Sequence, residues 1–435
     1  MSATARPLGQ SPNRAGSARL RDWTDAHRSV TIIISMAIVT VLMYVLPILP
    51  PLNVVQTAGT WYDSFANAGV FVLLAMGLNV VIGMAGLLDL GYAAFFAIGA
   101  YAYAYSNSPF SGVDLPFFPM LVVGAFVAAV FGILLGAPTI RLRGDYLAIM
   151  TLGFGEIVPI VFLNLETYTR GTNGISGIYR PEALPAIQIP GTDVILGGPF
   201  GAISPFNYFI VMIGIVTVTM ILLYRLQDSR IGRAWNAIRE DELAAAANGI
   251  NTVTTKLLAF ALGATTSGLA GVFNASKLTI VSPDQFLFTV SFTVLAMVIL
   301  GGMGNIWGVA IGAFIVYMIQ VVILKNINGV LETIGVPDFT IPVLNVHVDL
   351  VNVKFVEFQF LLYGIALVLM MLLRPEGLFP SQRRRQELHI AEEFTEDFDE
   401  VTNVPVVPAA VAESPAPERD PSSADVRDPD TGDRS

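Results

Sequence analysis

Cysteine is absent from this chain of 435 residues, and histidine occurs only three times. Without thiols the chain cannot form disulfide bonds, thiolate metal sites or a cysteine nucleophile. The three histidines, His27, His347 and His389, lie far apart in the sequence. We therefore expect no histidine-based catalysis, and we predict no catalytic residue and no bound metal.

Charge is scarce as well. Charged residues make up 13% of the chain, whereas soluble domains contain about 25%, and hydrophobic residues make up 54%. This composition indicates that the lipid bilayer is the main solvent. The formal net charge of −10 is concentrated after Glu387, in a stretch rich in Pro, Ser, Glu and Asp. Such a stretch cannot bury a core, so we predict a disordered acidic tail over residues 376–435.

Long apolar runs dominate the remainder. A helix that crosses the hydrocarbon needs roughly 20 apolar residues. We predict an all-α polytopic membrane protein with about ten transmembrane helices, at residues 31–50, 64–82, 87–105, 117–138, 146–165, 206–225, 257–276, 287–303, 306–324 and 356–373. Glycines within these runs, such as Gly132, Gly268 and Gly271, are expected chiefly to permit close helix packing inside the subunit.

Basic residues set the expected orientation, because cytoplasmic segments of membrane proteins are enriched in Lys and Arg. With the N-terminus inside, fifteen arginines fall in inner segments and five basic residues in outer ones. We therefore predict that both termini are cytoplasmic. The expected organisation is a basic segment at 1–30, a membrane domain at 31–375 with outer loops at about 166–205 and 325–355, and the tail at 376–435.

One inner segment, at about 232–250, interrupts the apolar pattern with charged residues and four consecutive alanines. Asp228 or Ser229 can cap a helix there, and Gly249 suits a left-handed stop. Trp235, Ile238 and Ala245 fall on one side of this helix. The small alanines favour docking against a soluble partner. The alternative is an amphipathic helix at the lipid headgroups, which would normally carry large apolar residues and lysines.

Several blocks in this chain resemble the LivM-type permeases of bacterial branched-chain amino acid importers, and they occur in the order typical of that family. The inner segment resembles the coupling loop of ABC importer permeases. The matching blocks are GLNVVIGMAGLLDLGYAAFFAIGAYAYA (77–104), RLRGDYLAIMTLGFGEIV (141–158), TNGISGI (172–178), GRAWNAIREDELAAAANGI (232–250), MVILGGMGNIWG (297–308) and LLRPEGLFP (372–380). The long acidic tail and the polar segment at 325–355 depart from the family pattern.

The resemblance implies a transport subunit in the bacterial cytoplasmic membrane and not an enzyme. It implies a LivH-like permease partner, two cytoplasmic ATP-hydrolysing subunits, and an extracytoplasmic protein that delivers leucine, isoleucine or valine. The chain itself contains no GxxxxGK[ST] phosphate loop, so we expect it to bind no ATP or other cofactor. Three alternatives remain: a permease for urea or short amides, a passive channel, and a membrane enzyme that uses Glu156 or Asp89.

Candidate site residues fall into three groups. Contact with the ATP-hydrolysing subunits is expected from Arg233, Arg239, Glu240, Glu242, Ala244, Ala245 and Gly249. Polar residues at membrane depth, where they line the path or form internal hydrogen bonds, are Asn79, Asp89, Glu156 and Asn164. The large outer loop carries Arg170, Asn173 and Arg180, which either dock the delivery protein or belong to a solvated loop or lid.

Overall fold

The computed structural model describes residues 27–49, 57–140, 142, 144–181, 184–188, 195–198, 205–324, 339–341, 346–348, 358–374 and 377–379. Apart from residues 377–379, the acidic tail predicted at 376–435 lies outside the described residues, as do most of the basic segment at 1–30 and most of the segment at 325–355. The domain boundaries predicted there remain predictions.

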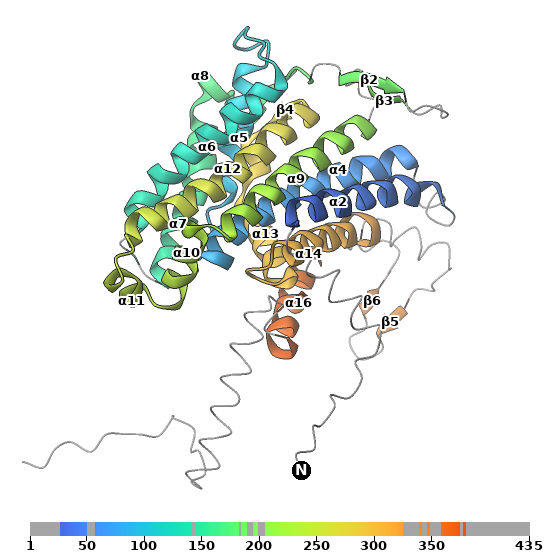
Figure 1. Ribbon diagram of the computed structural model, residues 1–435. Coiled ribbons are helices and arrows are strands. Elements are labelled where there is room, and N and C mark those ends of the chain that lie inside the picture. Colours follow the sequence, from blue (N-terminus) through green and yellow to red (C-terminus); the bar gives the residue numbers. More distant parts are fainter. Residues whose placement is uncertain are drawn as a thin grey trace, which may run out of the picture. The chain divides into compact units, whose positions relative to one another are not determined.

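Apolar helices form most of the described chain (Figure 1). They are α2 (Arg28–Val45), α4 (Ala58–Asn79), α5 (Ala93–Ser106), α6 (Phe117–Thr139), α7 (Asp145–Asn164), α9 (Pro205–Gln227), α12 (Thr252–Leu278), α13 (Phe288–Gly301), α14 (Ile306–Met318) and α16 (Gln359–Leu373). Each corresponds to one of the predicted spans. By length and composition, seven helices of the described chain are long and apolar enough to cross a membrane. The full count of about ten therefore remains a prediction.

Short elements connect these helices. The helical ones are α8 (Glu166–Thr169), α10 (Arg230–Glu240), α11 (Glu242–Ala247), the 3-10 turns η1 (Leu46–Ile48), η3 (Gly171–Asn173) and η4 (Pro283–Phe286), and the π-helical turns η2 (Val80–Met84) and η5 (Ile319–Leu324). The strands are β1 (Ile175–Ser176), β2 (Leu184–Gln188), β3 (Ile195–Gly198), β4 (Ile280–Val281), β5 (Phe339–Ile341) and β6 (Val346–Val348). They pair antiparallel as β1–β4, β2–β3 and β5–β6, which the all-α prediction did not include.

Helix α12 lies at the centre and packs against α4, α5 and α6. Small residues allow this close packing. A Cβ added to Gly268 would lie 2.6 Å from the Ala128 Cβ and 2.8 Å from the Gly124 carbonyl oxygen on α6. Gly271 meets the backbone of Phe96 on α5 in the same way. The glycines therefore pack helices within the subunit, as the sequence predicts.

The chain is not helical throughout between α4 and α5, and this break lies inside the bundle. Helix α4 continues into the π-helical turn η2 and then into a non-helical segment from Ala85 to Tyr92. Gly86 within this segment has a φ of 72°, a conformation that favours glycine. The Tyr92 hydroxyl donates to the Gly263 carbonyl oxygen at 2.7 Å, and Ser291 Oγ accepts from the first amide of α5 at 2.8 Å. The break therefore explains why the predicted span at 87–105 becomes a helix only from residue 93.

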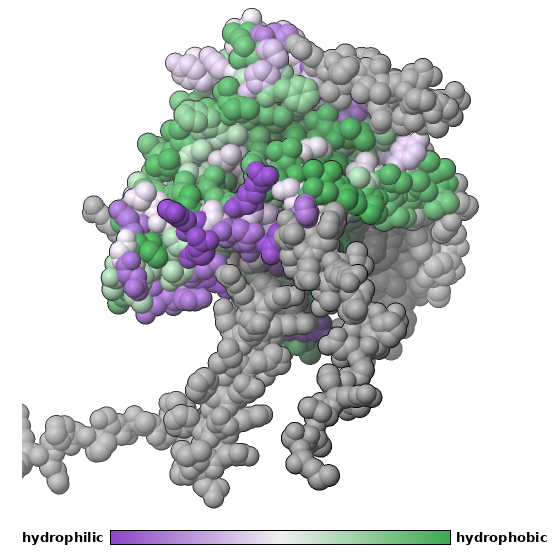
Figure 2. Space-filling view, in the orientation of Figure 1, coloured by the Kyte–Doolittle hydropathy of each residue, from purple (hydrophilic) through white to green (hydrophobic). Residues whose placement is uncertain are grey.

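Apolar side chains cover the middle of the face shown in Figure 2, and polar residues gather below them around α10 and α11. We call this the α10–α11 end of the bundle. The opposite end carries α8 and the β1–β4 pair (Figure 1). An apolar band between two polar ends is the pattern expected of a protein surrounded by lipid.

Candidate functional site

The charged segment at 232–250 forms two helices, where the sequence predicted one. Ser229 caps α10, with its hydroxyl accepting from the amides of Ile231 and Gly232, which confirms the predicted cap. Asp241 then interrupts the helix in an extended conformation, and its Oδ1 accepts from the amides of Leu243 and Ala244 at 2.8 and 3.0 Å. Aspartate competes for backbone donors in this way and so starts a new helix more readily than it continues one.

The side of this helix pair that faces the bundle is apolar, as predicted. Trp235 and Ile238 are buried, and the Trp235 indole donates to the Thr255 carbonyl oxygen at 2.7 Å. Ala245 is also buried, at 4% exposed, so it contacts its own chain. The exposed surface of α11 instead consists of Ala244, Ala246, Ala247 and Leu243, whose exposed fraction is 67%. We call these four residues the α11 surface.

Most of the predicted coupling charges are engaged within the chain. Arg233 donates to the Asp228 carbonyl oxygen at 2.9 Å, and Glu242 pairs with Lys256 at 2.6 Å. The Lys256 side chain is only 5% exposed, whereas that of Glu242 is 28% exposed. Glu240 is exposed, and Gly249 ends α11 with a φ of 84°, the left-handed geometry that the sequence predicts.

Arg239 connects the helix pair to the end of α4. Its Nη1 donates to the Gly83 carbonyl oxygen at 2.5 Å, and its aliphatic stem lies beside Gly86. Close to this bond, Asn79 Oδ1 accepts from the Gly304 amide at 2.8 Å. Asn79, predicted as a path residue, is fully buried and bridges α4 to the turn between α13 and α14. This arrangement joins the α10–α11 pair to the broken segment that carries Asp89.

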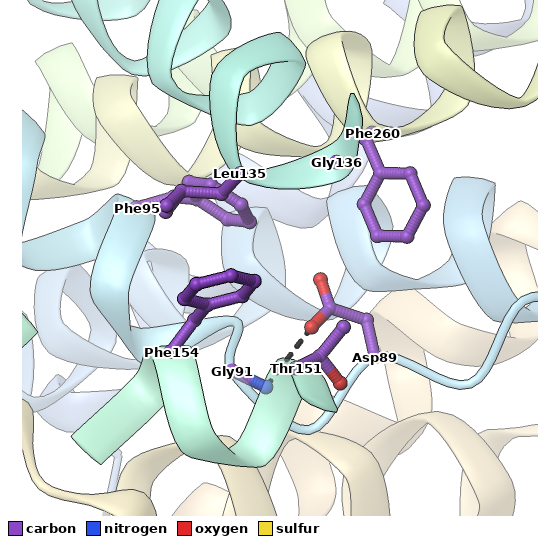
Figure 3. A pocket seen from close by; sticks show the side chains of 8 residues that line it. All are labelled: Asp89, Gly91, Phe95, Leu135, Gly136, Thr151, Phe154 and Phe260. Carbon is purple, nitrogen blue, oxygen red and sulfur yellow. Dashed lines mark hydrogen bonds between the residues drawn. The ribbon is translucent and has the colours of Figure 1, made fainter. Parts of the chain in front are cut away.

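Asp89 lies in a small pocket with aromatic walls (Figure 3). It is 2% exposed; its Oδ1 accepts from the Gly91 amide at 2.9 Å, while Oδ2 has no hydrogen-bond partner among the described residues. Thr151 on α7 holds the same segment by accepting from the Leu90 amide at 3.0 Å. The other lining residues are Phe95, Leu135, Gly136, Phe154 and Phe260. The pocket volume of about 10 Å³ is close to that needed for one water molecule.

The two other predicted path residues lie on the outside of α7. Glu156 and Asn164 are both exposed, and the Asn164 amide donates to the Ile160 carbonyl oxygen at 2.7 Å. Neither residue lines the Asp89 pocket, to which α7 contributes Thr151 and Phe154. The structure thus places Asp89 inside the bundle and Glu156 on its surface, on opposite sides of one helix.

At the opposite end of the bundle, the predicted docking residues separate. The Arg170 guanidinium lies over the Phe110 ring, 5.0 Å from its centroid, and Asn173 is exposed. Arg180 lines a pocket of about 160 Å³ together with Asp63, Asn67, Pro205, Tyr208, Lys277 and Leu278.

Asp63 and Lys277 form a contact that the sequence pattern did not indicate. The Lys277 ammonium, on a side chain only 6% exposed, contacts the Asp63 carboxylate at 2.8 Å and Asn67 Oδ1 at 2.5 Å. The only indication in the sequence was that each is a charged residue within an apolar helix. The two positions are 214 residues apart. No sequence spacing connects such distant residues.

Comparisons with known proteins agree with this architecture. The family described as "Branched-chain amino acid transport system / permease component" matches residues 60–371. The permease protein LivM of Salmonella typhimurium is 37% identical over 330 residues, covering 73% of this chain and 70% of that protein, and LivM of Escherichia coli gives the same values. The permease protein LivH of S. typhimurium is 24% identical over 261 residues, covering 58% of this chain and 82% of that protein. No solved structure gives a significant match.

The long apolar helices and these relatives together identify a multi-pass protein of the inner membrane. The family match covers more than half of the chain, including nearly all of α4, the elements from η2 to α14 and most of α16. The chain therefore belongs to the family of permease components of branched-chain amino acid transport systems.

Proposed function

We propose that this chain is a transmembrane permease subunit of an ATP-driven importer that takes up leucine, isoleucine and valine. Membership of the family supports the permease role, and the names of the relatives at 37% identity support the substrate class. The printed name of those relatives is a high-affinity branched-chain amino acid transport system permease. Permeases for urea or short amides are not favoured by these matches.

The proposal includes separate partner subunits. Relatives named LivH match a large part of the same chain, which supports pairing with a second permease of similar fold. Hydrolysis of ATP is assigned to two other subunits because the sequence contains no phosphate-binding loop. An extracytoplasmic binding protein would deliver the amino acid to the end opposite α10 and α11.

Topology follows from the same proposal. Ten spans with both termini in the cytoplasm place the α10–α11 end inside, where the basic residues are concentrated. The basic segment at 1–30 and the tail at 376–435 then also lie inside, flanking a permease domain at 31–375. The loops at 166–205 and 325–355 lie outside.

The observation that carries the proposal is the α11 surface. Leu243 and its neighbouring alanines present a small, exposed apolar surface on a short helix, beside exposed Glu240. A surface of this kind fits a groove on a soluble ATP-hydrolysing subunit. Closure of that subunit around ATP would displace α10 and α11, and the Arg239–Gly83 hydrogen bond would transmit the displacement to the segment that carries Asp89.

Uptake measurements test the substrate. Cells that lack this chain should lose uptake of labelled leucine and regain it when the chain is supplied, with uptake of labelled urea unchanged. Loss of urea uptake with intact leucine uptake would instead assign the chain to the urea branch. Conduction of leucine by the purified chain alone, without ATP, would indicate a passive channel.

Copurification tests the docking surface. Leu243→Asp places a charge at the centre of the α11 surface and should strongly reduce recovery of the ATP-hydrolysing subunits with the tagged permease. The matched control is Val113→Asp, which changes an exposed valine outside α10 and α11. Equal recovery from both variants would contradict docking at α11.

A further inference from the structure

Three helices expose faces that suit lipid directly. On α6 and α16, and on α2 beyond Arg28 at its start, the large exposed side chains are apolar and require only hydrocarbon around them. The most exposed among them are Ile38 and Val41 on α2, Val122 and Phe126 on α6, and Leu372 and Leu373 on α16.

The exposed face of α7 is different. Ile149, Gly153, Glu156 and Ile160 follow one another at intervals of four, three and four residues, so they share one side of the helix. All four are exposed, and a Cβ added to Gly153 would meet nothing within 4 Å. We call these four residues the α7 face. It combines apolar side chains with a gap at glycine and a carboxylate in the middle.

The position of Glu156 decides what can cover this face. Glu156 lies eleven residues after Asp145, where α7 begins, so it is roughly 16 Å along the helix and deep within a bilayer. Among the described residues, none forms a hydrogen bond or an ion pair with its carboxylate. A charge exposed to hydrocarbon at this depth costs about 3 kcal/mol or more, so lipid is an unfavourable neighbour.

Soluble proteins cannot reach a surface at this depth, since α7 is surrounded by the bilayer. The occupant must therefore be embedded in the membrane and must offer Glu156 a polar group or trapped water. A glycine next to the carboxylate also lets a second helix approach closely, as small residues do between membrane helices. Both properties point to another membrane protein and not to a binding protein, an ATP-hydrolysing subunit or a lipid.

We propose that the α7 face is the surface on which the second permease subunit docks, with Glu156 in a polar gap between the two subunits. This inference rests on the proposed function, which supplies a second permease of similar fold. The buried side of α7 carries Thr151 and Phe154, which line the Asp89 pocket, so one helix separates that pocket from the subunit interface.

Site-specific crosslinking tests the surface. The natural chain has no cysteine, so each introduced cysteine reports on one position. Gly153→Cys and Ile160→Cys on α7 are compared with Val122→Cys on α6 and Ile38→Cys on α2, which are 69% and 63% exposed. Each variant, in the complete transporter in native membranes, is labelled with a maleimide photocrosslinker and irradiated, and adducts are identified by mass spectrometry.

We expect the α7 variants to crosslink to the second permease and the α2 and α6 variants to give at most a tenth of that yield. Absence of a protein adduct at both α7 positions, with leucine uptake retained, would overturn the docking surface and leave the proposed transport function intact. An adduct with another copy of this chain, and none with the second permease, would also overturn it. Loss of uptake in cells without the chain tests the transport function separately.

Substitution of Glu156 provides a second test. If Glu156 faced lipid, Glu156→Leu would preserve assembly and uptake. Docking through the α7 face instead predicts that Glu156→Leu reduces copurified second permease at least fivefold at unchanged thermal stability of the chain, whereas Glu156→Gln retains most of it. Normal assembly and uptake of Glu156→Leu would overturn the proposal.

Discussion

Arg239, in the last turn of α10, donates a hydrogen bond to the carbonyl oxygen of Gly83, at a nitrogen–oxygen distance of 2.5 Å and a separation of 156 residues. This bond joins an exposed helix to the π-helical end of α4. Beyond Gly83 the chain turns at Gly86 and reaches the buried carboxylate of Asp89. One hydrogen bond and six residues of backbone therefore connect α10 to the most buried acid of the described chain.

Removal of this bond should uncouple ATP use from transport. Arg239→Ala deletes a hydrogen bond from a charged donor, which contributes about 1.5–3 kcal/mol. We expect leucine uptake per ATP hydrolysed to fall about tenfold in proteoliposomes containing the complete transporter. Arg230→Ala, at an exposed position in the first turn of the same helix, is the control. An unchanged ratio of uptake to hydrolysis in Arg239→Ala would contradict this route.

Asp89→Asn should raise the stability of the chain while lowering its transport activity. The amide oxygen can still accept from the Gly91 amide, while the charge is removed from an apolar pocket. We expect the free energy of unfolding to rise by about 1 kcal/mol, because a buried charge without full compensation is costly. Uptake should decrease severalfold if the carboxylate acts in the path. Asp114→Asn, at an exposed position, controls for the substitution itself. Lower stability with normal uptake would identify Asp89 as purely structural.

The Glu242–Lys256 ion pair should respond asymmetrically to removal of either partner. Glu242→Ala leaves the nearly buried Lys256 ammonium without its carboxylate and should destabilise the chain by about 2 kcal/mol. Lys256→Met leaves Glu242 without its partner, but the Glu242 carboxylate still reaches water. This variant should therefore lose less free energy of unfolding than Glu242→Ala. Thermal unfolding in detergent, followed by tryptophan fluorescence, measures both. Equal decreases in the free energy of unfolding of the two variants would show that water also reaches the Lys256 ammonium.

Gly268 should tolerate no side chain. In Gly268→Val the new Cβ would overlap Ala128 and the Gly124 carbonyl group, and we expect a loss of about 1–3 kcal/mol from overpacking between α12 and α6. Gly214→Val is the matched control, since a Cβ at Gly214 meets nothing within 4 Å. Similar melting temperatures for the two variants would mean that α6 and α12 separate easily.

Local features of the charged segment were predictable because they depend on neighbouring residues. The Ser229 cap, the left-handed Gly249 and the apolar side formed by Trp235, Ile238 and Ala245 all follow from local sequence. The interruption at Asp241 was missed. Its side chain accepts from the amides of Leu243 and Ala244 in the first turn of α11, a local competition that helical periodicity does not reveal.

Contacts between distant residues were not predictable. Asp89 and Glu156 are both polar residues within apolar runs, yet Asp89 is buried in a small pocket with aromatic walls and Glu156 lies on the surface. Helical periodicity alone does not decide which side of α7 is covered, because both sides are largely apolar. The pairing of Lys277 with Asp63 was equally invisible from spacing.

Three properties could be read from the residues without a fold: the chain is a membrane protein, its long helices occupy the apolar runs, and one charged segment interrupts them. These properties depend on composition and on periodicity over a few turns. The hydrogen bond from Arg239 to Gly83, the burial of Asp89 and the outward position of Glu156 are visible only in the folded chain. Those outcomes depend on how α4, α7 and α12 pack, and packing is set by shape complementarity between segments far apart in the chain.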